Sequence, residues 1–380
     1  MKDNNFYASL IYCLEQRAAT LGLQDSWEWV LNDPVVGCFT PALHILDLEG
    51  YLQLSNTLRQ KTREIYWINT GLWLKREHQL KEILDKLEQE NIEFVPLKGA
   101  ALLKTIYPKV GLRTMTDIDI LVRPIDFLKA ARIFAEDNLQ PGWSVESEDL
   151  FGFASLPPEF WPGELSFSNQ QHLRIDLHQE MVTYHWFRLA FPVDIDSVWE
   201  RCVRISDSDE HYWKTMLSPY DMLMNMCLHL ALHGLQVIKN FYDVDLFLRN
   251  LPTDWDWKRF ISIIKCTQLC SASYHTFTFC QEFFRTPIPA DVLSALKPAR
   301  FDIWQIQSLI TPKDILENRR KLGLRYPSLV KFALFDGNKI KLKSLLNLLF
   351  PKRQWLERNY TSTNLFSHWS HILQVLSRGE

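Results

Sequence analysis

Two aspartates stand one residue apart within the short run Thr116–Val122. The run alternates polar and apolar residues, which is typical of a β-strand, so Asp117 and Asp119 project from one face and Ile118 and Ile120 from the other. Two neighbouring carboxylates repel each other unless a cation lies between them, and Mg²⁺ prefers hard oxygen ligands of this kind. The doublet therefore indicates a metal site, although a solvated strand face has the same pattern.

A second feature lies upstream, where a short apolar run ends in Lys98-Gly99 and a helical pattern begins. Glycine at a strand-to-helix turn lets backbone amides approach a phosphate closely, and the start of a helix favours an anion. The Lys98 ammonium would add a positive charge facing a triphosphate. An ordinary surface turn can have the same two residues, so this turn indicates a phosphate site only together with the doublet.

A third carboxylate lies on the later run Arg174–His178. In a strand, Asp176 and His178 share one face, and Ile175 and Leu177 share the other. If this strand pairs beside the strand of the doublet, three carboxylates converge, and such a cluster supports two metal ions that bridge phosphates and activate an attacking oxygen. A half-exposed strand with its polar side in water is the alternative interpretation.

His229 and His233 are four residues apart in a helical segment and therefore lie on one face of that helix. The spacing also occurs in zinc sites, but Leu230 stands where a zinc peptidase has its catalytic glutamate. Two interpretations stay open on the residues alone. The histidines are a hydrogen-bonded pair in the core, or they join Asp243 as the ligands of a metal-dependent hydrolase.

Taken in order, these pieces resemble the DNA polymerase β-like nucleotidyltransferase superfamily, and within it the uncharacterised nucleotidyltransferase family NTP_transf_5. Members carry a Leu-Lys-Gly turn, an arginine shortly before an acidic doublet, an Asp-Leu-His strand, and a helical segment with paired histidines followed by an acidic residue. The matching positions are Leu97-Lys98-Gly99, Arg113, Thr116-Asp117-Ile118-Asp119, Asp176-Leu177-His178, His229, His233 and Asp243. The resemblance covers roughly Glu90 to Pro289. The superfamily usually has Gly-Ser at the phosphate turn, and Lys98-Gly99-Ala100 lacks that hydroxyl.

The resemblance implies a metal-dependent transferase that moves a nucleoside monophosphate from a nucleoside triphosphate to an acceptor hydroxyl or similar group and releases pyrophosphate. Its catalytic and metal-binding residues would be Asp117, Asp119 and Asp176, with Mg²⁺ or Mn²⁺ as the ion. The residues that it implies around the nucleotide are Lys98, Gly99, Arg113, Thr116, His178, His229, His233, Lys239 and Asp243.

ATP is the nucleotide that we favour, and AMP the group transferred. The expected acceptor is a small molecule, a peptide or a protein rather than a nucleic acid, in a biosynthetic setting. Two alternatives to catalysis of this kind remain: a catalytically silent binding or regulatory protein with the same fold, and the metal-dependent hydrolase.

The spacing of apolar positions predicts the elements that carry these residues. Helical periodicity covers residues 6–90, including a long helix from about Leu58 to Glu90 that we expect to be broken near Gly71. Helices return after the capping pair Ser218-Pro219. The predicted strands are 92–97, 117–122, 164–168 and 172–179, the last two joined by a turn at Asn169-Gln170, and the predicted helices between them are 100–107 and 125–137.

The predicted fold class is α+β, with a small mixed-sheet nucleotidyltransferase core flanked by helical regions. The predicted boundaries are 1–90 for the N-terminal helical region, 91–210 for the core and 211–380 for the C-terminal helical domain.

The composition limits the classes of function. The chain has 380 residues and a formal net charge of -3, so broad binding to nucleic acid or to a membrane surface is not expected. Neither a secretory signal nor an apolar run long enough to span a bilayer stands out, which predicts a cytoplasmic protein. The odd number of scattered cysteines, 7, argues against a disulfide framework. We expect a monomer or a small homo-oligomer.

Overall fold

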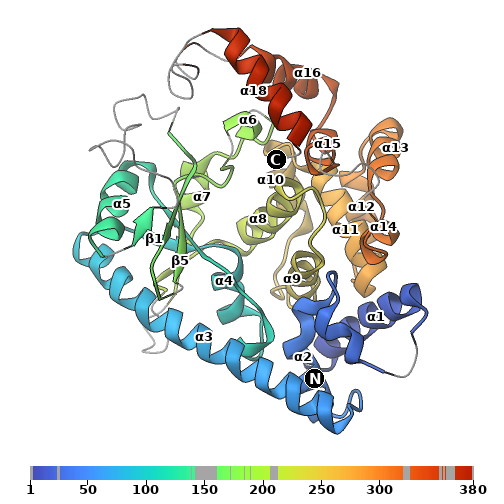
Figure 1. Cartoon of the computed structure of the whole chain (residues 1–380). Helices are drawn as coiled ribbons and strands as arrows, with labels where there is room; N and C mark the ends of the chain where they lie inside the picture. The colour runs from blue at the N-terminus through green and yellow to red at the C-terminus, as the bar shows by residue number, and fades with distance from the viewer. Residues whose placement is uncertain are drawn as a thin grey trace.

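In a computed structural model, helical regions from both ends of the chain lie beside a small main sheet (Figure 1). The predicted α+β class is confirmed, because helices combine with a five-stranded mixed sheet and a two-stranded one. Within the described part of the chain, no helix has the length and apolar character needed to cross a membrane. The structure describes residues 3–23, 26–137, 139–141, 161–171, 173–183, 185–188, 190–205, 213–319, 326–350, 353, 356 and 364–378.

The N-terminal region is helical, as predicted. It consists of α1 (Asp3–Leu21), the 3-10 turns η1 (Glu28–Asn32) and η2 (Gly37–Phe39), α2 (Thr40–Leu48) and α3 (Asn56–Gln89). The long helix α3 packs against α2 at its start and against α5 (Phe127–Glu136) beside the sheet (Figure 1). It therefore connects the N-terminal helices to the sheet.

The predicted break at Gly71 is wrong, because α3 continues through this residue for its full 34 residues. Gly71 is exposed, and nothing lies within 4 Å of the position that a side chain would occupy. A glycine inside a helix costs only about 1 kcal/mol relative to alanine. The buried residues at the end of α3, Leu80, Ile83, Leu84 and Leu87, offset that cost by packing.

The main sheet has the strand order β1-β2-β5-β4-β3. Its strands are β1 (Phe94–Pro96), β2 (Ile118–Val122), β3 (Gln140–Pro141), β4 (Glu164–Ser168) and β5 (Arg174–His178). β2 and β5 run parallel at the centre, and the other neighbours are antiparallel. The predicted hairpin of β4 and β5 is confirmed. Strand β2 begins one residue later than predicted, so Asp117 lies just before it.

The centre of the sheet is buried. Every residue of β2 is buried, and Phe134 of α5 contacts Phe167 of β4 with the ring centroids 5.3 Å apart. The other short elements of this part are α4 (Lys98–Thr105), η3 (Val110–Leu112), η4 (Pro124–Asp126), α6 (His185–Arg188), α7 (Ile195–Glu200), β6 (Val203–Arg204) and β7 (Thr215–Met216). Helix α4 packs against β2.

The C-terminal region is helical, as predicted. Its helices are α8 (Pro219–Leu232), α9 (Ile238–Arg249), α10 (Trp257–Cys266), α11 (Cys270–Phe284), α12 (Ala290–Leu296), α13 (Arg300–Leu309), α14 (Pro312–Leu316), α15 (Tyr326–Ala333), α16 (Asn338–Leu349) and α18 (Leu365–Arg378). Ser218 caps α8 by accepting a hydrogen bond from the Asp221 amide at 3.2 Å, which confirms the predicted cap.

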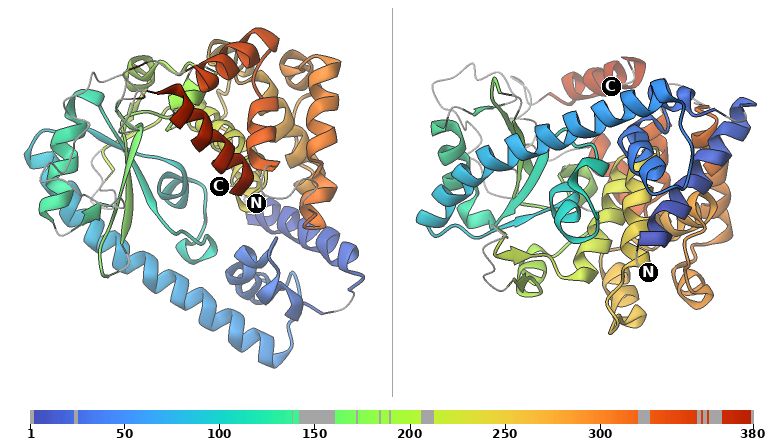
Figure 2. Two further views of the ribbon diagram at one scale, coloured as in Figure 1. Left: turned by 45° about the horizontal axis from the view of Figure 1, so that its top comes forward. Right: turned by 90° about the horizontal axis from the view of Figure 1, so that it is seen from below.

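Helix α1 packs against α11 and α14, so the N-terminal end of the chain lies against the C-terminal helices (Figure 2). Gln16 on α1 donates from Nε2 to the carbonyl oxygen of Phe283 at 3.0 Å. Arg17 pairs with Asp33 at 2.7 Å, which ties α1 to the loop after η1. This packing places the η1–η2 loop near the start of α9.

Candidate active site

The three predicted carboxylates line a single pocket of about 390 Å³ between the sheet and helices α8 and α9. Asp119 and Asp176 are direct neighbours across the parallel β2–β5 pair, and each is only 6% exposed. Asp117, just before β2, is half-buried. The expectation that the strand of Asp176 lies beside the strand of the doublet is therefore confirmed.

Asp119 is held by two nitrogen donors. The Lys98 ammonium lies 2.5 Å from its Oδ1, and the Nε2 atom of His178 lies 2.9 Å from the same oxygen. Burial raises the pKa of Asp119, but the Lys98 charge and the His178 hydrogen bond outweigh it and hold that pKa well below its usual range. Asp119 is therefore a stable anion, and Lys98 is the cation beside it.

Asp176 differs, because its Oδ1 atom is buried and has no hydrogen-bond partner among the described residues. The Nε atom of Arg174 is 3.6 Å from it, which is too long for a hydrogen bond. A buried carboxylate oxygen without a partner is costly, and a ligand or an ion can satisfy it. Asp176 thus offers an open coordination position beside Asp119.

The donor set fits a magnesium or manganese ion that a nucleotide helps to bind. In the part of the chain that the structure describes, no three His, Cys, Asp or Glu side chains are grouped closely enough to hold an ion by themselves. Mg²⁺ is usually held by one or two carboxylates together with water and substrate phosphates. Asp117, Asp119 and Asp176 are the carboxylates that could hold such an ion, and a triphosphate would complete the coordination.

The Lys98-Gly99 turn has an unusual backbone. Lys98 opens α4 with a φ of 46°, a left-handed conformation that is strained for a residue with a side chain. A Cβ atom on Gly99 would lie 2.2 Å from Nη1 of Arg113 and 2.7 Å from Sδ of Met115. Glycine is therefore required here for close packing under Arg113, in addition to any contact with phosphate.

Arg113 and Asp243, two of the predicted nucleotide contacts, bind each other. The guanidinium donates from Nε to Oδ1 at 3.0 Å and from Nη2 to Oδ2 at 2.8 Å, and the Tyr107 hydroxyl adds a hydrogen bond to Oδ1 at 2.6 Å. Arg113 lines the pocket, but Asp243 lies behind it. The pair ties α9 to the loop before β2. With both oxygens of Asp243 engaged, the ligand set proposed for a hydrolase lacks its carboxylate.

His229 and His233 form part of the pocket wall opposite the carboxylates, and their rings are 4.3 Å apart between centroids. Burial, followed by the nearby Lys98 ammonium, lowers the pKa of both histidines. Both rings are therefore neutral at pH 7 and can accept as well as donate hydrogen bonds. His178 lies outside the pocket wall and acts on the site through Asp119.

Two further predicted residues border the pocket. Lys239 donates from Nζ to the Thr114 carbonyl oxygen at 3.0 Å, and Thr116 donates from its hydroxyl to Asp117 at 3.1 Å. Seven polar or sulfur-containing residues of the wall were not predicted from the sequence: Met115, Glu164, Arg174, Met181, Thr183, Asn225 and Asn240. The four-residue spacing from His229 could have identified Asn225, since it places both residues on one face of α8.

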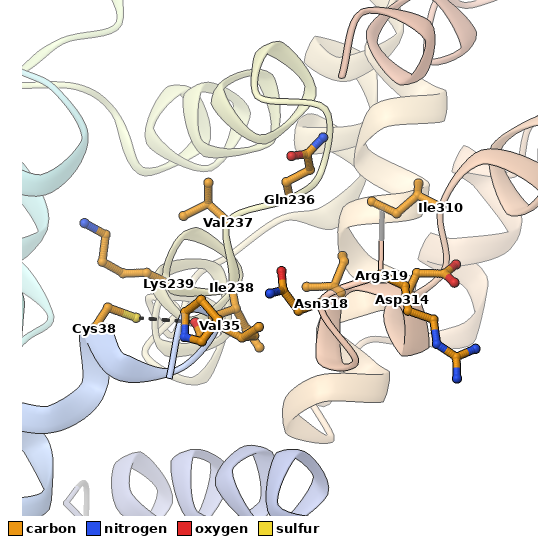
Figure 3. Close-up of a pocket in the computed structure, with 12 residues that line it drawn as sticks. Val35, Cys38, Gln236, Val237, Ile238, Lys239, Ile310, Asp314, Asn318 and Arg319 are labelled. Atoms are coloured by element: carbon orange, nitrogen blue, oxygen red, sulfur yellow. Dashed lines mark hydrogen bonds between the residues drawn. The ribbon is translucent and has the colours of Figure 1, made fainter. Parts of the chain in front are cut away.

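A second cavity of about 370 Å³ adjoins this pocket and shares Val237 and Lys239 with it (Figure 3). Its walls come from three distant segments: the η1–η2 loop with Val35, the start of α9, and the region of α14 with Ile310. The Lys239 side chain extends away from the α14 side of the cavity, whereas the Asn318 amide faces the cavity (Figure 3). The two hollows therefore meet at the first turn of α9.

A family model described as uncharacterised nucleotidyltransferase matches residues 37–285. The matched region runs from η2 to the residue after α11. It contains every residue that lines the pocket of Asp117, Asp119 and Asp176. No curated protein matches the chain.

Proposed function

The chain belongs to this family of uncharacterised nucleotidyltransferases, and on that premise we propose that it transfers AMP from ATP to a hydroxyl group of a small molecule or peptide. Pyrophosphate is the second product. The observation that carries the proposal is the buried Oδ1 of Asp176 beside Asp119, which accepts no hydrogen bond from the described residues and meets Arg174 only at 3.6 Å. The same pocket contains the Lys98-Gly99 turn. A protein with only a structural use for this pocket gains nothing from such a buried oxygen.

Asp117 and Asp119 are the residues that we assign to a Mg²⁺ or Mn²⁺ ion bound together with the triphosphate. When bound, the ion neutralises phosphate charge and polarises the phosphate that is attacked. Lys98, released from Asp119, pairs with phosphate oxygens. The neutral histidines His229 and His233, which also line the pocket, donate hydrogen bonds to the phosphate oxygens.

Asp176 is the residue that we assign to the acceptor. The acceptor oxygen attacks the α-phosphorus, the bond from that phosphorus to the oxygen that bridges to the β-phosphate breaks, and pyrophosphate leaves. The hydroxyl proton passes to the carboxylate of Asp176, whose Oδ1 is free of other hydrogen bonds among the described residues. Positioning of the two reactants supplies much of the remaining rate.

We place the acceptor in the second cavity. It joins the carboxylate pocket at Val237 and Lys239, and its volume of about 370 Å³ suits a small molecule or the end of a peptide. Filling the cavity by Ile310→Trp is expected to abolish transfer to the acceptor and to leave nucleotide binding unchanged. We also place the protein in the cytoplasm, where its seven free cysteines match a reducing compartment.

The direct test is incubation of the full chain with Mg²⁺ and each of the four NTPs in the presence of candidate acceptors, followed by mass spectrometry for an added nucleotide. We expect an AMP adduct with the wild type. Asp176→Asn is expected to reduce the rate by roughly 10²–10⁴-fold, the usual contribution of a general base.

Asp254→Asn is the matched control, because Asp254 is exposed and does not line the pocket. Circular dichroism checks that each variant folds. Stabilisation by Mg-nucleotide without turnover on any acceptor would favour a silent binding protein instead. Wild-type protein that binds no nucleotide at all would refute the proposal.

A further inference from the structure

Asn225 is a polar residue in an otherwise apolar part of α8. Its neighbours Met222, Leu223, Met224 and Met226 are buried, and Asn225 itself is 2% exposed. The side chain lines the carboxylate pocket, and its Nδ2 atom has no hydrogen-bond partner among the described residues. A buried amide donor without a partner destabilises a fold, and leucine or methionine would fill the same space without that cost. The pocket lining and the unpaired donor together point to a ligand.

The depth of Asn225 in the pocket indicates which part of a ligand it would contact. Along α8 the pocket wall becomes steadily more buried, from the exposed His233 through the half-buried His229 to Asn225. At 2% exposed, Asn225 is also more deeply buried than Asp119 and Asp176 of the same wall, each of which is 6% exposed. Asn225 therefore lies at the inner end of the pocket, one helical turn beyond the histidines.

The proposed function puts the phosphates beside the Lys98 ammonium, which lies 2.5 Å from Asp119 Oδ1. Another part of the nucleotide is therefore left to meet Asn225. A flat, uncharged group with hydrogen-bonding edges matches a buried, neutral amide whose donor is unpaired. In a nucleoside triphosphate, that group is the base.

We propose that Asn225 reads the nucleobase of the bound nucleotide and selects adenine; this assignment rests on the function proposed above. The amide nitrogen donates to a ring nitrogen, and the amide oxygen accepts from the exocyclic amine, the pairing by which asparagine recognises adenine elsewhere. Asn225 is thus a specificity-determining residue and takes no part in the transfer step.

The test compares three ligands in the presence of Mg²⁺ by calorimetry: ATP, purine riboside triphosphate, which lacks the exocyclic amine, and inorganic tripolyphosphate. With the wild type, loss of the amine is expected to weaken binding roughly tenfold. In Asn225→Leu, ATP and the purine analogue are expected to bind equally, because the partner of the amine is gone. Tripolyphosphate is expected to bind both proteins alike.

If Asn225 had only a structural role, its replacement would lower the melting temperature. Asn225→Leu removes an unpaired donor, so its melting temperature is expected to equal or exceed that of the wild type even though ATP binds more weakly. Asn250→Leu, at the exposed end of α9, is the control and keeps the wild-type preference for ATP. Asn225→Ser replaces the leucine variant if that variant fails to fold.

The outcomes separate the two proposals. A tenfold preference for ATP over the purine analogue that persists in Asn225→Leu would overturn the role of Asn225 and leave nucleotide binding intact. Equal binding of ATP and the purine analogue to the wild type would do the same. Failure of the wild type to bind both ATP and tripolyphosphate would overturn the proposed function as well.

Discussion

Removal of the Asp243 carboxylate tests whether this residue holds the fold together or contacts the nucleotide. The side chains of Arg113 and Asp243 are 7% and 5% exposed, and two charge-assisted hydrogen bonds join them. Asp243→Ala leaves a buried guanidinium without its counterion and removes the acceptor of the Tyr107 hydroxyl. Breaking a buried pair from one side costs about 3–5 kcal/mol, so we expect a loss of that size in the free energy of unfolding.

Urea unfolding, followed both by tryptophan fluorescence and by circular dichroism, measures this loss where the two transitions coincide. Glu49→Ala is the control, because it breaks the exposed Lys109–Glu49 pair and is expected to cost about 1 kcal/mol or less. The double variant Arg113→Met/Asp243→Leu removes both charges and is expected to recover most of the stability. A cost below about 1 kcal/mol for Asp243→Ala would refute the structural role of the pair.

Three further predictions follow from other contacts. Lys98→Met leaves Asp119 without its ammonium, so Mn²⁺ is expected to bind several-fold more tightly in the absence of nucleotide, as measured by electron paramagnetic resonance. Tripolyphosphate loses the same cation and is expected to bind roughly tenfold more weakly, as measured by calorimetry. Gly99→Ala drives a methyl group against Arg113, and the free energy of unfolding in urea is expected to fall by about 1–3 kcal/mol. This loss is expected to be smaller in a double variant that also lacks the Arg113 guanidinium. Burial lowers the pKa of His275 from 6.5 to about 4. The stability that comes from its neutral ring is therefore complete above pH 6.5 and falls as the pH drops toward 4. Between pH 7 and pH 5, the free energy of unfolding is expected to fall by about 2 kcal/mol less for His275→Leu than for the wild type.

Local signals in the sequence predicted the elements that they control. Ser218-Pro219 started a helix because a cap and a first-turn proline act within one turn. The hairpin of β4 and β5 followed from alternation around Asn169-Gln170, where the Asn169 side chain accepts a hydrogen bond from the Gln171 amide at 3.0 Å. Gly71 misled the prediction, since an exposed glycine has no effect on packing and a long helix tolerates its intrinsic cost.

Pairings between distant residues were harder to predict. Arg113 and Asp243 are separated by 130 positions, and each alone reads as a solvated charge or a ligand contact. Only their shared burial shows that they satisfy each other. The same holds for the second cavity, because its walls combine the η1–η2 loop with the region of α14. The site carboxylates were predictable because strand alternation fixes their direction, and a parallel register then placed Asp119 beside Asp176.

The contact between Lys98 and Asp119 gives a physical reason for a lysine at the Lys98-Gly99 turn, where we propose that phosphate binds. The turn lacks the hydroxyl of the broader superfamily, and its ammonium instead lies 2.5 Å from a carboxylate that we assign to the metal. An ion that binds alone must displace this ammonium and leave it half-buried without its carboxylate, which is unfavourable. An ion that arrives with a triphosphate gives Asp119 a new cation and Lys98 a new anion at once. We therefore expect metal and nucleotide to bind cooperatively, each weakening when the other is absent.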